Sequence, residues 1–330
     1  MKAVILNKDF NLEDGFTERP QPKNHEVLIQ IKAIGFNPID YQMLENELER
    51  KLMSSPILGR ELSGIVVGKG TDVTQFNIGD EVFCGSGSMG SNGTYAEYIS
   101  VPEAIVALKP KNISFEQAAS VPSAGLTSLQ IFKRLKLQPE QTIFITGAAG
   151  GVGSFLIKIL LAHHIENFVI TVGSEENKQM FLTLGLKEYQ IINYKEEHLV
   201  ENILKANHQK PFDIGIDLVG NYMAEVTAEV LKINGTYVDV TALVTKEAHE
   251  LLFNKGTLIM NISNYAYSMI KQYDYYKNSL EEIAELIESG SIPPSQHKII
   301  GDLSLETVLK AHSILKNNQT QCHKLIMKNS

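Results

Sequence analysis

The 330-residue sequence predicts an α/β protein in which a partly open, strand-rich, barrel-like part is interrupted by a doubly wound α/β part. Three observations predict this fold. Short strands separated by Gly, Pro and Asn turns fill roughly the first 120 residues, strands and helices alternate from Thr142, and the pattern changes again after about residue 265. At roughly 100–200 residues per domain, the length also fits two domains.

The first part of the chain reads as an antiparallel, barrel-like set of strands. Turn residues separate the expected strands, which are Lys2–Leu6, Glu26–Ala33, Leu62–Val67, Asp80–Cys84 and Tyr95–Val101. The period changes near Ser114, because Ser114-Phe115-Glu116-Gln117 has the Ser-x-x-Gln spacing of a capping box. A helix is therefore expected to begin there.

The middle part predicts a parallel sheet. Six strands are expected, namely Thr142–Thr146, Phe168–Val172, Gln190–Asn193, Asp213–Asp217, Thr236–Val240 and Leu258–Ile262. Helical segments separate most of them, and this rhythm is typical of a parallel sheet covered by helices on both faces.

The last part of the chain has two helical patterns and a final strand. The first helix ends at Gly290, and the second, Ser304–Leu315, precedes the apolar strand Lys324–Met327. We expect this tail to return to the first part. That divides the chain into 1–122 with 266–330 and an inserted domain, 123–265.

Composition excludes several classes of protein. The net charge of −8 counts against nucleic acid as the main partner. Cys84 and Cys322 are too few for a disulfide framework and form no Cys-x-x-Cys zinc pair. The first residues do not resemble a signal peptide, and no run approaches the roughly 18 apolar residues that cross a bilayer. We therefore expect a cytoplasmic protein with neither a membrane nor a nucleic acid as partner.

The most informative segment runs from an expected strand through a glycine-rich turn into a helix, Ser154–Ala162. Its sequence is Ile143-Phe144-Ile145-Thr146-Gly147-Ala148-Ala149-Gly150-Gly151-Val152-Gly153. Small residues let the backbone approach a pyrophosphate, whose charge the free N–H groups of the helix N-terminus stabilise. A tight strand-to-helix turn is the alternative, but the position at the first crossover of a six-strand unit favours a dinucleotide held by Gly150, Gly151 and Val152.

The end of the second strand bears on which dinucleotide binds. The position where an acidic residue would bind the ribose 2′-hydroxyl of NAD is Gly173, followed by Ser174. Ser174, Lys178 and Tyr194 offer contacts to a 2′-phosphate, which favours NADP. Two alternatives stay open: Glu175 or Glu176 binds the hydroxyl instead, or Ser174 is a helix cap and Lys178 a solvated charge.

Several motifs in order resemble the medium-chain dehydrogenase/reductase superfamily, in its zinc-free quinone oxidoreductase and enone reductase branch. They are Gly35-Phe36-Asn37-Pro38-Ile39-Asp40, Pro56-Ile57-Leu58-Gly59-Arg60-Glu61-Leu62-Ser63-Gly64, Phe76-Asn77-Ile78-Gly79-Asp80-Glu81-Val82, Gly93-Thr94-Tyr95-Ala96-Glu97-Tyr98, Ala118-Ala119-Ser120-Val121-Pro122, the glycine turn, Asp213-Ile214-Gly215-Ile216-Asp217-Leu218-Val219-Gly220 and Asn234-Gly235-Thr236-Tyr237-Val238. The resemblance implies a GroES-like catalytic domain, a Rossmann domain and an active site in the cleft between them.

The resemblance also implies which groups are missing and which act. Asn37 and Arg60 stand where zinc-dependent relatives have a Cys and a His ligand, so no metal is expected. The implied activity is zinc-independent reduction of a quinone or an α,β-unsaturated carbonyl by NADPH. The expected site residues are Asn37, Asp40 and Tyr41 with Gln42 near the substrate, and Thr127 and Thr241 at the cofactor. A strand-ending turn at Asn37 and a helix cap at Asp40 are the structural alternatives.

Two other functions remain open at this point. The pair Tyr273 and Lys277, with the same glycine turn, fits a short-chain dehydrogenase-type carbonyl reductase. A non-catalytic nucleotide-binding redox sensor or structural protein is the other alternative, because a fold does not fix a function. The family resemblance further implies a homodimer, with Leu258–Ile262 expected at the edge of the sheet.

Overall fold

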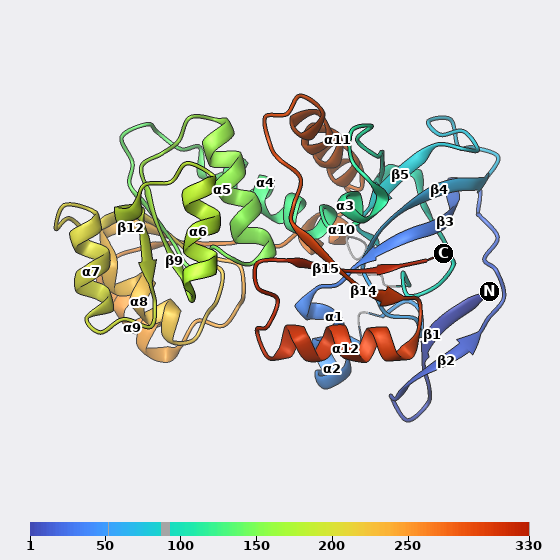
Figure 1. The fold of residues 1–330 in the computed structure, drawn as a ribbon, viewed down its shortest axis with the longest axis horizontal. Helices are drawn as coiled ribbons and strands as arrows, with labels where there is room; N and C mark the ends of the chain where they lie inside the picture. Colours follow the sequence, from blue (N-terminus) through green and yellow to red (C-terminus); the bar gives the residue numbers. More distant parts are fainter. Residues whose placement is uncertain (52, 87–92, 330) are drawn as a thin grey trace. The chain divides into compact units, whose positions relative to one another are not determined.

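The computed structural model describes residues 1–51, 53–86 and 93–329 and divides the chain into two compact units (Figure 1). Unit 1 comprises Met1–Leu126 and Asn264–Ser330, and unit 2 comprises Thr127–Ser263. The helix α4 (Pro122–Leu135) continues from unit 1 into unit 2.

Unit 1 is built on a sheet with seven strands among the described residues, in the order β14-β15-β3-β4-β5-β7, with β6 also paired to β3. These strands are β3 (Glu26–Gly35), β4 (Glu61–Lys69), β5 (Glu81–Cys84), β6 (Tyr98–Pro102), β7 (Val106–Leu108), β14 (His297–Asp302) and β15 (Lys324–Lys328), and β1 (Lys2–Leu6) pairs separately with β2 (Leu12–Phe16). All pairs are antiparallel except β14 with β15. The strand expected at Tyr95 begins later because Tyr95 and Ala96 bond to β1 instead.

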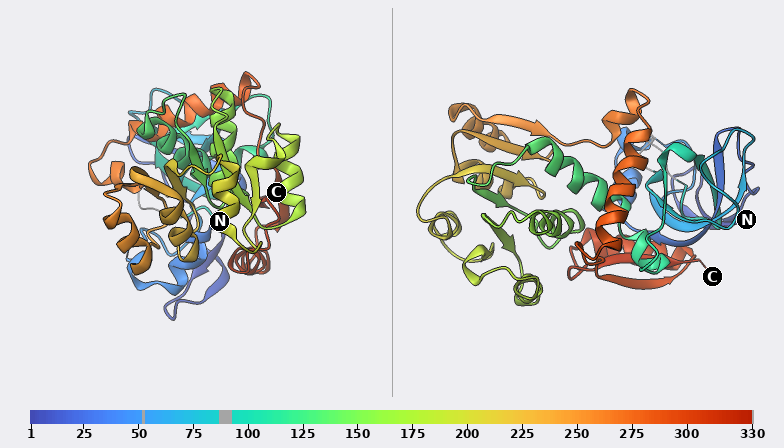
Figure 2. Two further views of the ribbon diagram at one scale, coloured as in Figure 1. Left: turned by 90° about the vertical axis from the view of Figure 1, so that its left-hand side faces the viewer. Right: turned by 90° about the horizontal axis from the view of Figure 1, so that it is seen from above.

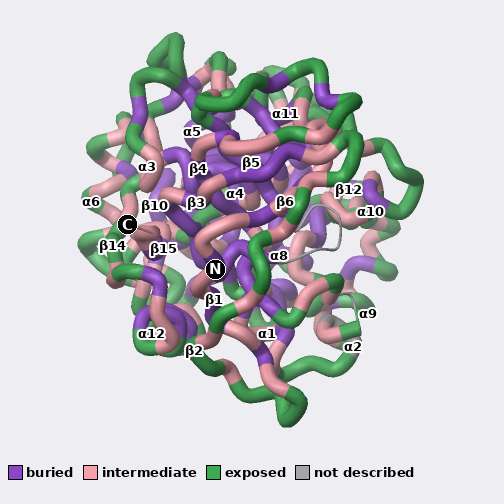
Figure 3. The backbone as a smooth tube through the Cα atoms, turned by 90° about the vertical axis from the view of Figure 1, so that its right-hand side faces the viewer, coloured by how far each residue is buried: buried purple, intermediate pink, exposed green. Residues whose placement is uncertain are grey.

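Helices pack around this sheet, whose central strands β3 and β4 are largely buried (Figure 3). They are α1 (Pro38–Glu45), α2 (Glu47–Arg50), α3 (Phe115–Ala119), α10 (Tyr265–Met269), α11 (Asp274–Glu288) and α12 (Leu305–Lys316), with the 3₁₀ turn η2 (Glu103–Ile105). The expected capping box of α3 is confirmed, because Ser114 N–H donates to Gln117 Oε1 and Gln117 N–H donates to Ser114 Oγ. β15 pairs with β3, so the tail does return to the first part.

Unit 2 contains a parallel sheet of six described strands in the order β10-β9-β8-β11-β12-β13. Numbered along the chain this order is 3-2-1-4-5-6, the doubly wound Rossmann order. The strands are β8 (Ile143–Ile145), β9 (Phe168–Val172), β10 (Ile191–Asn193), β11 (Phe212–Asp217), β12 (Leu231–Asp239) and β13 (Leu258–Asn261). β12 begins earlier than expected because Leu231 pairs with Phe212, and Gln190 belongs to the 3₁₀ turn η3 (Glu188–Gln190) instead of a strand.

Helices cover both faces of the parallel sheet (Figure 2). They are α5 (Gly151–Ala162), α6 (Glu175–Thr183), α7 (Leu199–Ala206), α8 (Tyr222–Val230) and α9 (Lys246–Asn254). Successive residues of β8 pack to opposite sides, since Ile143 and Ile145 join one apolar cluster and Phe144 the other. Because all six strands are parallel, their carboxyl ends meet at one edge of the sheet.

Candidate active site

The glycine turn after β8 brings backbone groups to this carboxyl edge. Gly147 has a φ of +65°, and its carbonyl accepts from Gly150 N–H at 3.0 Å. A Cβ on Gly153 would lie 2.4 Å from that carbonyl oxygen, so only glycine lets the helix start so close to the strand. The helix α5 begins at Gly151, three residues before the expected start, with exposed backbone at Gly150 and Gly151 and a half-buried Val152. The turn therefore fits a pyrophosphate bound by free N–H groups.

The buried carboxylate of Asp217 supports this turn through hydrogen bonds. Asp217, at the end of β11, accepts Thr146 Oγ1–H at 2.8 Å and the Tyr237 hydroxyl at 2.7 Å. The same carboxylate accepts the N–H groups of Val219 and Gly220, each at 3.0 Å. Three parallel strands are thereby tied together at the edge where the glycine turn lies. Burial, and then the charge of Asp217, raise the pKa of Tyr237, so its hydroxyl stays protonated as a donor.

The expected 2′-phosphate contacts lie after β9 and β10. The Tyr194 ring lies directly against Gly173, where a Cβ would come within 2.6 Å of it. Ser174 Oγ accepts Asn177 N–H, so Ser174 does serve as the cap of α6. Lys178 Nζ donates to Glu188 Oε1 at 2.7 Å. A 2′-phosphate would therefore compete with Glu188 for the Lys178 ammonium.

Thr127 and Thr241 are the other expected cofactor contacts. Thr127 is half-buried on α4, next to Ser128, whose hydroxyl donates to the Val152 carbonyl of α5 at 2.9 Å. Thr241 follows β12, where Asp239 Oδ1 accepts its N–H at 3.0 Å. Unit 2 thus places Thr241 at the carboxyl edge and joins the helix of Thr127 to the helix that follows the glycine turn.

Unit 1 holds a buried polar cluster around Asn37, which precedes α1. Asn37 Nδ2 donates to Glu61 Oε1 at 2.8 Å and to Ser123 Oγ at 3.3 Å. Its Oδ1 accepts from Lys324 Nζ at 2.6 Å, and the same ammonium lies 2.6 Å from Glu61 Oε1. Both amide hydrogens of Asn37 are therefore occupied within the protein. The half-buried Arg60 stands next to Glu61 in the chain.

Asp40 forms the helix cap that the sequence offered as the structural alternative. Its Oδ2 accepts Asn37 N–H at 2.8 Å, and its Oδ1 is buried without a hydrogen-bond partner. Burial raises the pKa of Asp40 to about 7, although the Asn37 N–H and the charges of Arg60 and Lys324 act in the opposite direction. Near pH 7, Asp40 is thus present in both protonation states.

An aromatic group joins α1 to α12. The Tyr95 hydroxyl lies 3.1 Å from His312 Nε2, and the rings of Phe36 and Tyr41 contact the His312 ring at centroid distances of 6.1 and 6.4 Å. Burial lowers the pKa of His312 to about 4, while burial and the nearby Asp40 raise that of Tyr95. Both side chains are therefore neutral at pH 7, and the half-buried Tyr41 packs on this group.

The residues around Asn37 do not fit a zinc ion. Zinc prefers thiolate, imidazole and carboxylate ligands. Among the residues that the structure describes, no group of three or more His, Cys, Asp or Glu side chains could hold a metal. Asn37 Oδ1 and Glu61 Oε1 are already bonded to the Lys324 ammonium, a cation that belongs to the protein itself.

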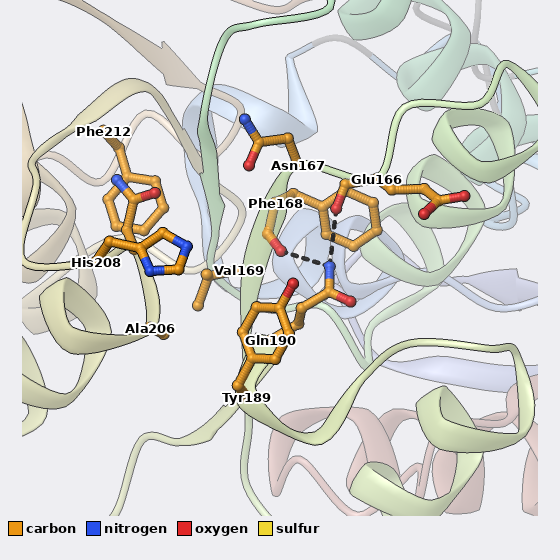
Figure 4. Close-up of a pocket in the computed structure, with 10 residues that line it drawn as sticks. Glu166, Asn167, Phe168, Val169, Tyr189, Gln190, Ala206, His208 and Phe212 are labelled. Carbon is orange, nitrogen blue, oxygen red and sulfur yellow. Dashed lines mark hydrogen bonds between the residues drawn. The ribbon is translucent and has the colours of Figure 1, made fainter.

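Two other features lie away from these sites. A small, solvent-open hollow lies at the amino end of β9, where Gln190 Nε2 donates to the carbonyls of Glu166 and Phe168 (Figure 4). It is at the opposite end of the sheet from the glycine turn. The Tyr273 and Lys277 pair of the short-chain alternative lies at the start of α11, in unit 1, and Lys277 pairs with Glu281.

Sequence reasoning missed the residues that support both sites. Asp217 and Tyr237 stood inside quoted motifs, but only the strand order shows that they meet. Glu61 and Lys324 are charged residues that each begin a strand with a mostly apolar middle, a signal that could have marked them as buried partners.

The fold, the glycine turn and two family models together support an NAD(P)-dependent oxidoreductase. A model of the alcohol dehydrogenase GroES-like domain matches residues 23–111, and one of zinc-binding dehydrogenases matches residues 151–286. No helix in the described ranges is long and apolar enough to span a membrane.

Known relatives then give the family. A zinc-type alcohol dehydrogenase-like protein of Staphylococcus aureus (strain COL) is 30% identical over 99% of both chains, and a quinone oxidoreductase of Rattus norvegicus is 25% identical over 93% of this chain and 90% of that protein. The Escherichia coli quinone oxidoreductase complexed with NADPH is 26% identical and superposes with a TM-score of 0.85 over 99% of this chain and all of that one. The chain belongs to the medium-chain dehydrogenase/reductase superfamily, in its quinone oxidoreductase branch.

Proposed function

We propose that this protein is a zinc-independent, NADPH-dependent reductase of quinones or α,β-unsaturated carbonyls. The observation that carries the proposal is the Lys324 ammonium bonded to both Asn37 and Glu61, which leaves these side chains unsuited to zinc. The similarity to a quinone oxidoreductase complexed with NADPH supports the same conclusion.

Residues of unit 2 would hold the cofactor. The N–H groups that follow Gly150 would bind the pyrophosphate, and Thr127 and Thr241 would contact the cofactor nearer its reactive end. Ser174, Lys178 and Tyr194 would bind the 2′-phosphate. When bound, NADPH supplies the hydride.

Residues of unit 1 would serve the acceptor. Reduction of a quinone or enone places negative charge on an oxygen, which a donor must stabilise and protonate. Both hydrogens of the Asn37 amide are occupied, so Asn37 acts by positioning its neighbours. The Tyr41 hydroxyl is the proposed donor, Asp40 would hold the start of its helix, and Gln42 is a further candidate.

We also propose a cytoplasmic homodimer formed through the edge strand β13. Leu258 and Ile259 on this strand are 61% and 41% exposed, and among the described strands β13 has a hydrogen-bonded neighbour on one side only. Light scattering tests this assembly: a mass of one chain contradicts it.

The test of the function is a titration followed by an acceptor panel. Fluorescence with NADPH and NADH gives the two affinities. Loss of NADPH absorbance is then followed with 1,4-benzoquinone, 9,10-phenanthrenequinone and a short 2-alkenal, with and without chelator. NADPH-selective turnover that the chelator does not change is the expected result. Tight cofactor binding without turnover would overturn the proposal and favour the non-catalytic sensor.

A further inference from the structure

The Lys324 ammonium is a buried charge with two strong partners. Its side chain is 9% exposed and that of Glu61 is fully buried. Taking such a pair out of water costs free energy that the mutual attraction only partly returns. A protein with apolar residues of similar volume at these positions would often be equally stable, so stability alone does not explain this ion pair.

The pair fixes the orientation of the Asn37 amide. Lys324 donates to Oδ1, while Nδ2 donates to Glu61 Oε1 and Ser123 Oγ. Turning the amide over would bring its hydrogens against the ammonium and its oxygen against the Glu61 carboxylate. Without Lys324, nothing among these contacts would hold Oδ1 in place.

The pair also fixes the start of α4. Glu61 Oε2 accepts the N–H of Ser123 at 2.8 Å, in the first turn of the helix. A carboxylate is favourable there because it satisfies a free N–H and faces the positive end of the helix dipole. One turn later the same helix carries Thr127.

We propose that Lys324 is a positioning residue, an internal cation that holds Asn37 at the acceptor site and, through Glu61, holds the helix that carries Thr127. The inference rests on the proposed reductase function. Lys324, on β15, thereby holds in place Asn37 and the start of α4, two segments that lie far from it in the sequence.

The titration of Asp40, which depends on the charges around it, gives a second way to test the role of Lys324. Burial has the largest effect on the pKa of Asp40 and raises it, and the hydrogen bond from the Asn37 N–H lowers it. Among the charges nearby, those of Arg60 and Lys324 lower this pKa and that of Glu61 raises it. Tyr95, whose pKa is raised by burial and then by the charge of Asp40, and His312 are both neutral at pH 7. Removing the Lys324 charge therefore shifts the titration of Asp40 to higher pH, whereas looser packing that lets water reach Asp40 shifts it to lower pH.

The experiment compares Lys324→Met with Lys324→Arg and with the control Lys328→Met. Lys328 lies on the same strand in a half-exposed pair with Glu116 at 3.4 Å. We expect Lys324→Met to lower kcat roughly tenfold or more, because small displacements of reacting groups have effects of this size. KM for the acceptor, the affinity for NADPH and the far-ultraviolet circular dichroism should stay close to wild type. Lys324→Arg should recover part of kcat, and Lys328→Met should match wild type.

The double variant Glu61→Gln with Lys324→Met guards against misfolding, because it leaves no unpaired buried charge. We expect it to fold, to bind NADPH and still to lose kcat roughly tenfold. The inference is overturned if folded Lys324→Met, or the folded double variant, has a kcat within twofold of wild type. It is also overturned if the Asp40 titration in Lys324→Met is not shifted from that of wild type. Wild-type protein that reduces no acceptor would instead overturn the proposed function.

Discussion

Replacing Asp40 with Asn should change how stability depends on pH. Asp40 is fully buried, and its pKa rises from 3.8 to about 7 on folding because of that burial. Between these two values the folded state binds more protons than the unfolded state. The free energy of unfolding therefore falls as pH rises from about 4 to about 7, and the whole cost of the ionised carboxylate is present above pH 7.

The size of the effect follows from the pKa difference. About 3 pH units at about 1.4 kcal/mol per unit correspond to about 4 kcal/mol. Asn cannot ionise, and its oxygen can still accept the N–H of Asn37. Relative to wild type, the Asp40→Asn variant should therefore gain about 4 kcal/mol between pH 4 and pH 8.

The assay is urea unfolding of both proteins followed by circular dichroism from pH 4 to pH 8. Taking the difference between the variants cancels the titration of all other groups. Asp213→Asn is the control of opposite sign: burial acts to raise the pKa of Asp213, but hydrogen bonds from Lys232 and Thr142 lower it, so its contribution is lost as pH falls. If the difference in unfolding free energy between wild type and Asp40→Asn does not change with pH, the Asp40 carboxyl does not have a raised pKa in the folded state.

Three further predictions concern unit 2. Lys178→Met should weaken NADPH binding roughly tenfold without changing NADH binding. Glu188→Gln, which frees the Lys178 ammonium, should strengthen NADPH binding. Equal effects on the two cofactors in a fluorescence titration would contradict this prediction. Gly153→Ala should lower the free energy of unfolding by about 1–3 kcal/mol, because its Cβ meets a backbone carbonyl, and unchanged urea unfolding would contradict that packing. Tyr237→Phe should cost about 1.5–3 kcal/mol in the same assay, since Asp217 loses a donor; a neutral effect would show that this bond does not support the turn.

Much of the fold could be predicted from local sequence patterns. The strands of unit 2 contain short apolar runs with turns at both ends, so all six were expected in the right places, with their ends shifted by up to five residues. β14 was missed because its residues are half-buried or exposed and give no apolar pattern. The strand expected from Tyr95 begins later in the structure. The local pattern could not show this, because the residue in β1 that bonds to Tyr95 lies more than 90 positions away in the sequence.

The site was predictable only where short motifs carry it. The glycine turn was recognised because small residues in one segment are sufficient to indicate close backbone approach. The role of Lys324 could not be recognised in this way, because Lys324 and Asn37 lie 287 positions apart and meet only when β15 pairs with β3. That Asn37 lies near the substrate stays a prediction, but its sequence motif did not show that its amide is hydrogen-bonded within the protein.

The central claim is hydride transfer from a nicotinamide to an acceptor without a metal. Its most direct test uses protein dialysed against chelator, NADPH deuterated at C4 on each face in turn, and a short 2-alkenal, with the product analysed by mass spectrometry. We expect one deuterium on the β-carbon of the product from one of the two labelled cofactors, at a rate that added zinc does not increase. A product without deuterium from either cofactor, or transfer that appears only after zinc is added, would contradict it.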